Sequence, residues 1–341
     1  MEYRQMGGSG LRVPILSFGT ATFGGGNEFF KAWGNTQQDE ANRLVHLCMD
    51  YGVTLFDTAN VYSRGMSEEI LGKALIGIRD NALIATKGSF PMADQPNDYG
   101  SSRIHITKQC EDSLKRLKTD HIDIYYMHGF DALTPIDETL HTLDNLVQSG
   151  KVRYIGCSNF SGWHLMKSLG IADKYGWPKY AAHQVAYSLL NRDFEWELMP
   201  LGIDQKVSTF IWGGLASGQL TGKFRRNQTA PENNRIAQGG GQGPEVPREL
   251  LYNIVDVLDE IAKETGKTVA QVSLNWLLQR PTVTSIVIGA RNEEQLKQNF
   301  EAVDWNLTKE QVARLDKVST VPKVYPYWHQ AKFPMLMPPV V

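Results

Sequence analysis

Four proton-handling side chains in this sequence could share one active site. Each ends or closely follows a short apolar run that predicts a buried strand. The four are Asp57, Tyr62, Lys87 and His128. Taken singly, each has an ordinary explanation: a helix N-cap, a packed phenol, a solvated strand end or a core histidine. Four such groups at the ends of adjacent strands are difficult to assemble by chance, so together they predict an active site.

These four groups suit the protonation of an oxyanion as it forms on a carbonyl carbon. A tyrosine has an ordinary pKa of about 10, which is too high for efficient acid–base catalysis at neutral pH. An ammonium group beside the phenol favours phenolate, so we expect Lys87 to lower the pKa of Tyr62. Asp57 is expected to hold Lys87, and His128 can donate a hydrogen bond to the carbonyl oxygen. The set contains no reductant, so a hydride-donating cofactor is its natural complement.

Short apolar runs alternate with helical stretches, which is typical of an α/β fold. A hairpin is expected first, with strands at Glu2–Met6 and Leu11–Ile15. Eight further strands are predicted at Leu16–Phe18, Val53–Phe56, Leu83–Thr86, Ile122–Met127, Val152–Gly156, Tyr180–Val185, Val207–Ile211 and Ser285–Ile288. Helices are predicted at Thr36–Tyr51, Ser67–Ile78, Ile104–Leu117, Ile136–Gln148, Gly162–Lys174, Asp193–Ile203, Glu249–Thr265 and Val269–Gln279. This alternation favours a single (β/α)8 TIM barrel over residues 1–341, with its site at the carboxyl ends of the strands.

A doubly wound open sheet with two domains is the alternative architecture. A dinucleotide-binding sheet should carry Gly-x-Gly-x-x-Gly between its first strand and the following helix. The sequence has no such motif, and its cluster Gly239–Gly241 lies in a polar loop. The barrel is therefore the favoured prediction.

Three segments are expected to border the active site. Residues 88–103 and 213–247 are longer than ordinary connectors and follow the third and seventh barrel strands. Long loops in compact domains are often lids or binding loops, and both lie on the C-terminal face of the predicted barrel. The aromatic tail, residues 321–341, is expected to pack near this face, either as a strap over helices or as part of a pocket wall.

The composition is that of an ordinary globular protein, with 341 residues, 42% hydrophobic and 21% charged, and a net charge of −2. Near-neutral charge without a basic stripe argues against nucleic acid as a partner. The sequence shows no leader-like segment, and no apolar run approaches bilayer-spanning length. Three scattered cysteines without a C-x-x-C pair predict reduced thiols. We expect a cytoplasmic protein, monomeric or homo-oligomeric, that acts on a small molecule and binds neither nucleic acid nor membrane.

A metal-dependent hydrolase barrel is a further alternative, because His121, Asp123, His128 and Asp131 lie close together in the sequence. Such barrels usually need a His-x-His pair or an equivalent cluster at strand ends. The sequence contains neither, so no metal site is predicted.

The chain resembles the aldo-keto reductase superfamily from Tyr3 to about Leu315. The resemblance is carried by LFDTANVYSRGMSEEILGKAL, IATKG, IDIYYMHGFD, GKVRYIGCSNF, HQVAYSLLNR and IVIGARNEEQLKQN. It implies a (β/α)8 barrel with an N-terminal hairpin that reversibly reduces an aldehyde or ketone to an alcohol with NADPH. It also implies that the catalytic tetrad is Asp57, Tyr62, Lys87 and His128, with Tyr62 as the general acid and base.

The same resemblance implies a set of cofactor-binding residues. Ser158, Asn159 and Gln184 would hold the nicotinamide carboxamide, and Trp212 would stack on the ring. Arg291 would meet a 2′-phosphate, which implies NADP(H) over NAD(H). The remaining members are Gly19, Thr20, Ala21, Asp57, Gly213, Leu215, Ser217, Lys223, Arg235, Gly289, Gln295 and Asn299.

One motif departs from the family pattern. Relatives often read Trp or Tyr, then Ser-Pro-Leu, where this chain has Trp-Gly-Gly-Leu at residues 212–215. The serine hydroxyl near the pyrophosphate is missing, so we expect a more mobile loop and a lower cofactor affinity.

Apolar side chains near the expected site indicate a roomy pocket for an aryl, xenobiotic or otherwise bulky carbonyl. The residues expected to contact the substrate are Phe23, Trp33, Phe90 and His128. Two alternatives stand beside this interpretation. One is a keto-sugar or polyol dehydrogenase-reductase. The other is a nucleotide-binding regulatory subunit, because the superfamily includes potassium-channel β subunits that the chain also resembles.

Overall fold

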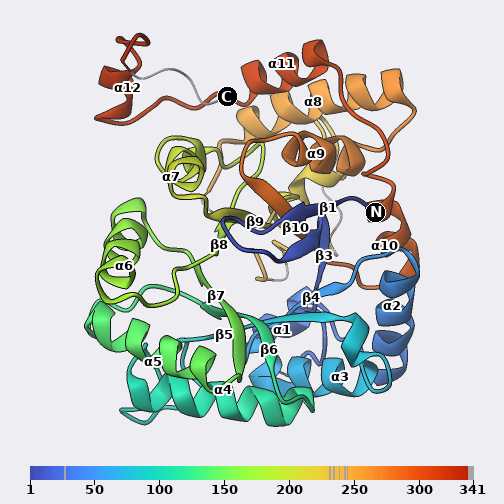
Figure 1. The fold of residues 1–341 in the computed structure, drawn as a ribbon. Helices are drawn as coiled ribbons and strands as arrows, with labels where there is room; N and C mark the ends of the chain where they lie inside the picture. The colour runs from blue at the N-terminus through green and yellow to red at the C-terminus, as the bar shows by residue number, and fades with distance from the viewer. Residues whose placement is uncertain are drawn as a thin grey trace.

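Eight parallel strands close into a barrel, which confirms the predicted fold (Figure 1). The computed structural model describes the chain except for residues 27, 230, 231, 233, 234, 238, 242, 244 and 337–341. The barrel strands are β3 (Leu16–Gly19), β4 (Leu55–Asp57), β5 (Leu83–Gly88), β6 (Ile122–Met127), β7 (Val152–Ser158), β8 (Ala182–Ala186), β9 (Ser208–Trp212) and β10 (Val283–Ile288). Parallel pairing of β10 with β3 closes the ring, with Ile286 opposite Leu16.

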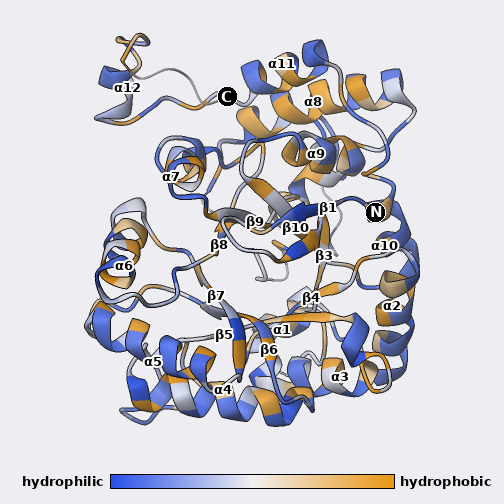
Figure 2. Cartoon of the chain, viewed as in Figure 1, coloured by the Kyte–Doolittle hydropathy of each residue, from blue (hydrophilic) through white to orange (hydrophobic). Residues whose placement is uncertain are grey.

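Helices surround the barrel and turn their apolar faces toward it (Figure 2). In α5, buried Leu140, Leu143 and Leu146 are spaced three residues apart, as one face of a helix requires. The helices are α1 (Glu28–Trp33), α2 (Gln38–Asp50), α3 (Met66–Ala74), α4 (Arg103–Leu117), α5 (Ile136–Gln148), α6 (Gly162–Tyr175), α7 (Leu198–Gln205), α8 (Arg248–Thr265), α9 (Val269–Leu278), α10 (Glu293–Phe300), α11 (Lys309–Val318) and α12 (Tyr327–Gln330). Short 3₁₀ turns lie at Tyr62–Gly65, Arg79–Asn81, Asp193–Glu195 and Ala216–Thr221. Among the described helices, none has the length and hydrophobicity needed to cross a bilayer.

A hairpin of β1 (Tyr3–Gln5) and β2 (Arg12–Pro14) lies across the N-terminal opening of the barrel, as predicted (Figure 1). Met6 and Val13 of the hairpin are fully buried. They pack on side chains that fill the barrel lumen, which are Leu55, Ala85, Ile124, Tyr126, Ala182 and Phe210. The lumen below the site is therefore a solid apolar floor.

The strand alternation continues from this floor to the polar residues above it. Side chains two residues apart on a strand point to the same side. Two residues beyond Leu55, Ala85, Tyr126, Ala182 and Phe210 come Asp57, Lys87, His128, Gln184 and Trp212. The residues predicted to do chemistry therefore form the next layer on the inner side of the barrel, at its C-terminal end.

The structure corrects some predicted helices. The stretch predicted as one helix at Asp193–Ile203 is divided into a 3₁₀ turn, Asp193–Glu195, and α7. Pro200 accounts for the division, because its ring excludes a helical carbonyl four residues earlier, at Trp196. Helices α1, α11 and α12 were not predicted, although α11 begins with a capping box in which Thr308 and Gln311 bond each other's backbone.

The tail is described as far as Leu336 and stands away from the barrel in Figure 1. The ring centroid of Tyr327 lies 6.0 Å from that of Trp196, next to α7. Tyr325 and Trp328 are exposed. Met337, which belongs to the predicted tail, lies outside the described residues.

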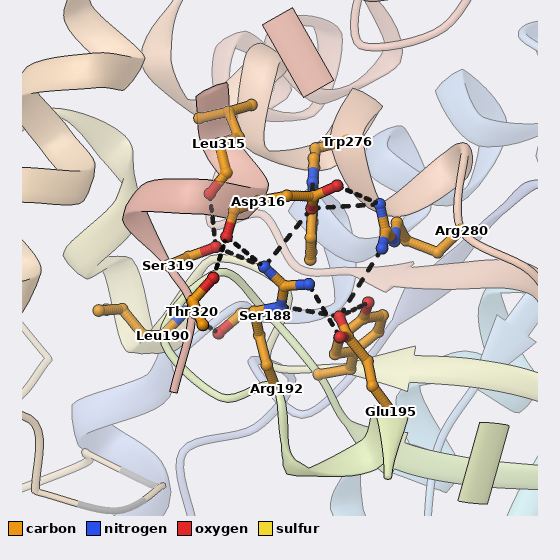
Figure 3. Close-up of polar contacts among 11 residues, drawn as sticks. Ser188, Leu190, Arg192, Glu195, Trp276, Arg280, Leu315, Asp316, Ser319 and Thr320 are labelled. Carbon is orange, nitrogen blue, oxygen red and sulfur yellow. Dashed lines mark hydrogen bonds and ion pairs between the residues drawn. The ribbon is translucent and has the colours of Figure 1, made fainter. Parts of the chain in front are cut away.

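A buried polar cluster ties the loop after β8 to α9 and α11 (Figure 3). The guanidinium of Arg192 donates to both carboxylate oxygens of Glu195, each at 2.8 Å. It also donates to the backbone carbonyl of Asp316 at 2.9 Å, while Arg280 pairs with the Asp316 carboxylate at 3.2 Å. The indole of Trp276 contacts both guanidinium groups, at 5.3 Å and 4.7 Å. Because the cluster follows β8 directly, it fixes the strand end that carries Gln184.

We expect Arg192→Met to lower the free energy of unfolding by ~3 kcal/mol, because the largely buried Glu195 carboxylate loses two hydrogen bonds and keeps only Arg280, 3.9 Å away, as a cation. Arg226→Met is the matched control, since Arg226 forms ion pairs with Glu249 and Asp256 on the surface. Surface pairs of this kind contribute little. Urea-induced unfolding of both variants measures the difference, and equal losses would show that the cluster is no more important than a surface pair.

Candidate active site

A cavity of about 830 Å³ opens at the carboxyl ends of the barrel strands, which is large for a small-molecule pocket. Most residues predicted from the sequence line it. They are Gly19, Ala21, Trp33, Asp57, Tyr62, Phe90, His128, Ser158, Asn159, Gln184, Trp212, Gly213, Leu215, Ser217, Lys223, Arg235, Gly289, Arg291, Gln295 and Asn299. The long loop after β9, the first turn after β3 and the segment after β10 thus meet in one cavity.

Lys87 and Asp57 form a buried ion pair in this layer. The Lys87 ammonium donates to Asp57 Oδ1 at 2.5 Å and to the Thr58 carbonyl at 2.8 Å. The Lys87 side chain is completely buried, and that of Asp57 is 5% exposed. Burial disfavours the ammonium, but the charge of the adjacent Asp57 carboxylate opposes this effect, and the pKa of Lys87 is raised. Lys87 therefore stays protonated at neutral pH.

Tyr62 lies within reach of this ammonium, with Lys87 Nζ 3.5 Å from its hydroxyl. Burial outweighs the lowering of the Tyr62 pKa that Lys87 produces as expected, so the net pKa of Tyr62 is raised. Burial raises the pKa of Tyr62 above 10, Asp57 adds to the rise, and the opposing effect of Lys87 is smaller. The phenol of the free protein is therefore protonated at neutral pH and can donate a proton.

His128 lies beside Tyr62, with ring centroids 5.8 Å apart and the planes nearly perpendicular. Phe90 stacks on the other side of the imidazole at 4.3 Å. Burial, and then the charge of Lys87, hold the pKa of His128 well below its usual value. The imidazole is consequently neutral throughout the physiological range and can serve as a hydrogen-bond donor without charge.

The side chains predicted to hold a carboxamide are bonded to one another and to the tetrad. Gln184 donates from Nε2 to Asp57 Oδ2 at 2.7 Å, and the Ser158 hydroxyl donates to the backbone carbonyl of Gln184 at 2.9 Å. Asn159 donates to the His128 carbonyl at 3.1 Å and accepts from the Trp212 indole at 3.0 Å. The polar layer that lies on the apolar floor is therefore held in place by its own hydrogen bonds.

The loop after β9 has a backbone suited to a close-lying anion. Gly213 has a φ of +71°, and no described atom lies within 4 Å of the position a Cβ would take. Ala216 and Ser217 also adopt positive φ. Such turns expose backbone N–H groups that form anion-binding concavities. This conformation favours glycine over the serine of the family motif at position 213, because a serine would be strained at a positive φ.

Two arginines meet at another part of the cavity. Arg291 donates to the backbone carbonyls of Trp33 at 2.9 Å and Ala32 at 2.6 Å. Arg235, from the long loop, lies 4.6 Å from the Trp33 ring. Burial, and then the like charge of Arg291, lower the pKa of Arg235 to about 10. No carboxylate among the described side chains pairs with either guanidinium, so the two cations fit an anionic ligand.

The structure corrects two predicted site residues and adds others. Thr20 is buried and its hydroxyl bonds Ser67 Oγ at 2.8 Å, so it does not line the cavity. Phe23 is fully buried and packs on Phe18 in the core, with ring centroids 5.9 Å apart. Lining residues that the sequence did not reveal are Thr22, Phe30, Val61, Gly214, Gly218, Thr221, Phe224, Thr268, Ala270, Leu274, Ile286, Val287, Ile288, Ala290 and Gln298.

Phe30 is the most informative of these additions, because its ring lies 5.8 Å from that of Tyr62. It belongs to α1, which has only six residues. A helix this short has too few residues for periodicity to identify it. The Gly-rich composition of the surrounding segment favoured a loop instead.

In the part of the chain that the structure describes, no group of three or more His, Cys, Asp or Glu side chains could hold a metal ion. His121 and Asp123, which gave the sequence some resemblance to a metal site, precede or begin β6 and interact with Asp120 and Arg79.

The model of the aldo/keto reductase family matches residues 15–320. The chain belongs to the aldo/keto reductase family. This is an oxidoreductase family, and the matched region contains the whole barrel and every cavity-lining residue named above.

Relatives of this aldo/keto reductase carry names that point to different functions. An uncharacterized oxidoreductase of Bacillus subtilis, YrpG, is 36% identical, covering 93% of this chain and 96% of its own length. A probable voltage-gated potassium channel subunit beta of Arabidopsis thaliana is 35% identical, covering 89% and 92%. An L-glyceraldehyde 3-phosphate reductase of Escherichia coli is 34% identical, covering 93% and 92%. Similarity of this degree shows the family and leaves the substrate to be argued from the site.

We expect Lys87→Met to lower the free energy of unfolding by ~3–5 kcal/mol, because the Asp57 carboxylate stays buried without a cation. Adding Asp57→Asn removes that charge and should restore most of the loss. Urea-induced unfolding of the single and double variants measures this coupling. If the second substitution deepens the loss instead, the charge of Asp57 is not what the single variant leaves unpaired.

Proposed function

We propose that this aldo/keto reductase converts a neutral, bulky aldehyde or ketone to an alcohol with NADPH. The observation that carries the proposal is the buried Asp57–Lys87 pair beneath a protonated Tyr62 that faces a large cavity. A phenol held in this way can donate a proton to a substrate oxygen.

In the proposed reaction Tyr62 and His128 both donate to the carbonyl oxygen of the substrate. NADPH, when bound, supplies a hydride to the carbonyl carbon. Tyr62 donates its phenolic proton to the oxygen as negative charge develops there, and the neutral imidazole of His128 donates a hydrogen bond to the same atom. Lys87 stabilises the resulting phenolate, and Asp57 keeps Lys87 in place. A proton from solvent then restores the phenol.

The charge of the cavity supports NADPH over NADH. Arg235 and Arg291 both line it, and no described carboxylate pairs with either one. NADPH differs from NADH by a 2′-phosphate, which is the kind of anion that paired guanidinium groups bind best. The guanidinium of Arg235 lies over the ring of Trp33. We therefore assign Trp33 to the phosphate end of the cavity and no longer to the substrate.

The opposite character around Tyr62 supports a neutral, apolar substrate. Besides the tetrad and Trp212, the side chains near the phenol are Phe30, Val61 and Phe90. The described cationic residues that line the cavity are Lys223, Arg235 and Arg291, and all belong to segments after β9 and β10. A phosphorylated aldehyde would bring a dianion beside Tyr62, where Lys87 is buried and already paired with Asp57 and no other described cation lines this part of the cavity.

We also infer a reducing, cytoplasmic setting for this enzyme. Its three cysteines, Cys48, Cys110 and Cys157, are free and buried. Cysteines of this kind are ordinary in reducing compartments.

NADPH oxidation across a panel of carbonyls tests the proposed function. We expect turnover of benzaldehyde derivatives and bulky ketones, and a kcat/KM at least roughly tenfold lower for glyceraldehyde 3-phosphate, which carries an unpaired charge into the site.

Reduction should be constant through neutral pH and decline as Tyr62 ionises above 10, because its pKa is raised. Tyr62→Phe should bind NADPH normally and lose turnover. A Tyr62→Phe variant with undiminished turnover would show that another group donates the proton.

Nucleotide titrations test the assignment of the two arginines. Arg235→Met should weaken NADPH binding by roughly 10- to 100-fold, the value of a charge-assisted hydrogen bond, and leave NADH binding unchanged. Arg225→Met is the matched control from the same loop, because Arg225 pairs with Asp259 outside the cavity. Quenching of tryptophan fluorescence gives both dissociation constants. Equal losses for NADPH and NADH would remove Arg235 from the 2′-phosphate site.

A further inference from the structure

We propose that Gln184 is a positioning residue for the Asp57–Lys87 pair, and that it thereby couples the nicotinamide end of the cofactor site to the proton donor. The second half of this proposal rests on the proposed function, whereas the first half concerns only the protein. The family resemblance assigns Gln184 to the nicotinamide carboxamide alone.

The atoms of the Gln184 amide are identified by its partner. One amide atom lies 2.7 Å from Asp57 Oδ2, at a site where both side chains are almost completely buried. An ionised carboxylate only accepts hydrogen bonds, so the amide atom facing it must be Nε2. The assignment therefore follows from chemistry and fixes the orientation of the whole amide group.

This contact completes the hydrogen bonding of the buried carboxylate. Lys87 donates to Oδ1 of Asp57, and Gln184 donates to Oδ2. Without Gln184, one carboxylate oxygen would be buried without a donor, and the carboxylate would be free to rotate about Lys87. Since Lys87 also approaches the Tyr62 hydroxyl at 3.5 Å, a rotation of Asp57 would shift the ammonium relative to the phenol. Gln184 thus acts on the proton donor through Asp57 and Lys87.

The same contact limits what Gln184 can offer to a ligand. Because one N–H of Nε2 is bonded to Asp57, the amide keeps its Oε1 as an acceptor and the second N–H of Nε2 as its remaining donor. A carboxamide that meets Oε1 turns its NH2 group toward it. Ser158 and Asn159 extend this fixed surface through bonds to the backbone carbonyls of Gln184 and His128 and to the Trp212 indole. One ordered network consequently joins the residues for the carboxamide to those for the proton.

Titratable groups from several elements lie around this contact, and they determine how a new charge there would behave. On the strands, Asp57 belongs to β4, Lys87 to β5 and Tyr126 to β6, while Tyr62 and His128 lie in the turns that follow β4 and β6. Of these, Lys87 is the nearby cation, and it already pairs with Asp57. Because Lys87 already pairs with Asp57, a second carboxylate at position 184 would lie beside Asp57 without a cation of its own. The two carboxyl groups would then share a proton.

Gln184→Glu tests the contact in the protein without cofactor or substrate. At low pH the protonated carboxyl that this substitution introduces can donate to Asp57 as the Gln184 amide does. We expect a protonated carboxyl band in the infrared spectrum that persists well above the ordinary glutamate pKa of about 4.3 and is lost near or above neutral pH. Adding Asp57→Asn should return that titration toward the ordinary value. A band that titrates as an ordinary glutamate in the single variant overturns the proposal, whether or not the protein reduces carbonyls.

Gln184→Met tests the coupling to the proton donor without a new charge. It keeps the size of the side chain and removes the donor to Asp57. We expect kcat to decrease roughly tenfold, the scale of a displaced catalytic group, and the alkaline limb of the pH profile to move upward, because an unpaired Asp57 oxygen disfavours phenolate at Tyr62 more strongly.

Gln271→Met is the matched control, since Gln271 is equally buried and caps α9 away from Asp57. It should reduce thermal stability without moving the pH profile. If Gln184→Met raises only the KM for NADPH and leaves kcat and the pH profile as they were, Gln184 serves the carboxamide alone and the proposal is wrong.

Discussion

The buried pair of Asp57 and Lys87 is the constraint on which the rest of the site depends. Two charges removed from water are stable only when geometry and further hydrogen bonds satisfy them. The Thr58 carbonyl and Gln184 supply those bonds, and Tyr62 lies at the edge of the same group. These residues come from three different strands and the turns that follow them. The barrel must therefore hold β4, β5 and β8 in register before the pair can exist at all.

The apolar floor and the polar cluster near β8 both serve this register. Met6 and Val13 close the lumen from below, so the inner side chains of the strands rest on a packed layer. Arg192 and its partners anchor the loop that leaves β8. Burial of Tyr62 and His128 raises the pKa of the phenol and lowers that of the imidazole, so Tyr62 stays protonated and His128 neutral. The proton chemistry is thus a result of burial as much as of residue type.

One part of the cavity is apolar and another part is cationic. Aromatic side chains surround Tyr62, and Arg235 and Arg291 occupy the segments that follow β9 and β10. One fold can serve relatives whose names point to different functions, because function depends on the residues of the site and not on the fold.

The sequence by itself determined the barrel and the hairpin, because short apolar runs that alternate with helical stretches are local patterns. It also placed the four candidate catalytic residues at or just after strand ends. It could not determine that Phe23 and Thr20 turn into the core, since their burial depends on contacts with Phe18 and Ser67 that form only in the folded barrel. Nor could it give the net pKa of Tyr62 or the bond from Gln184 to Asp57. Those depend on burial and on contacts between strands 127 residues apart, which exist only once the barrel has closed.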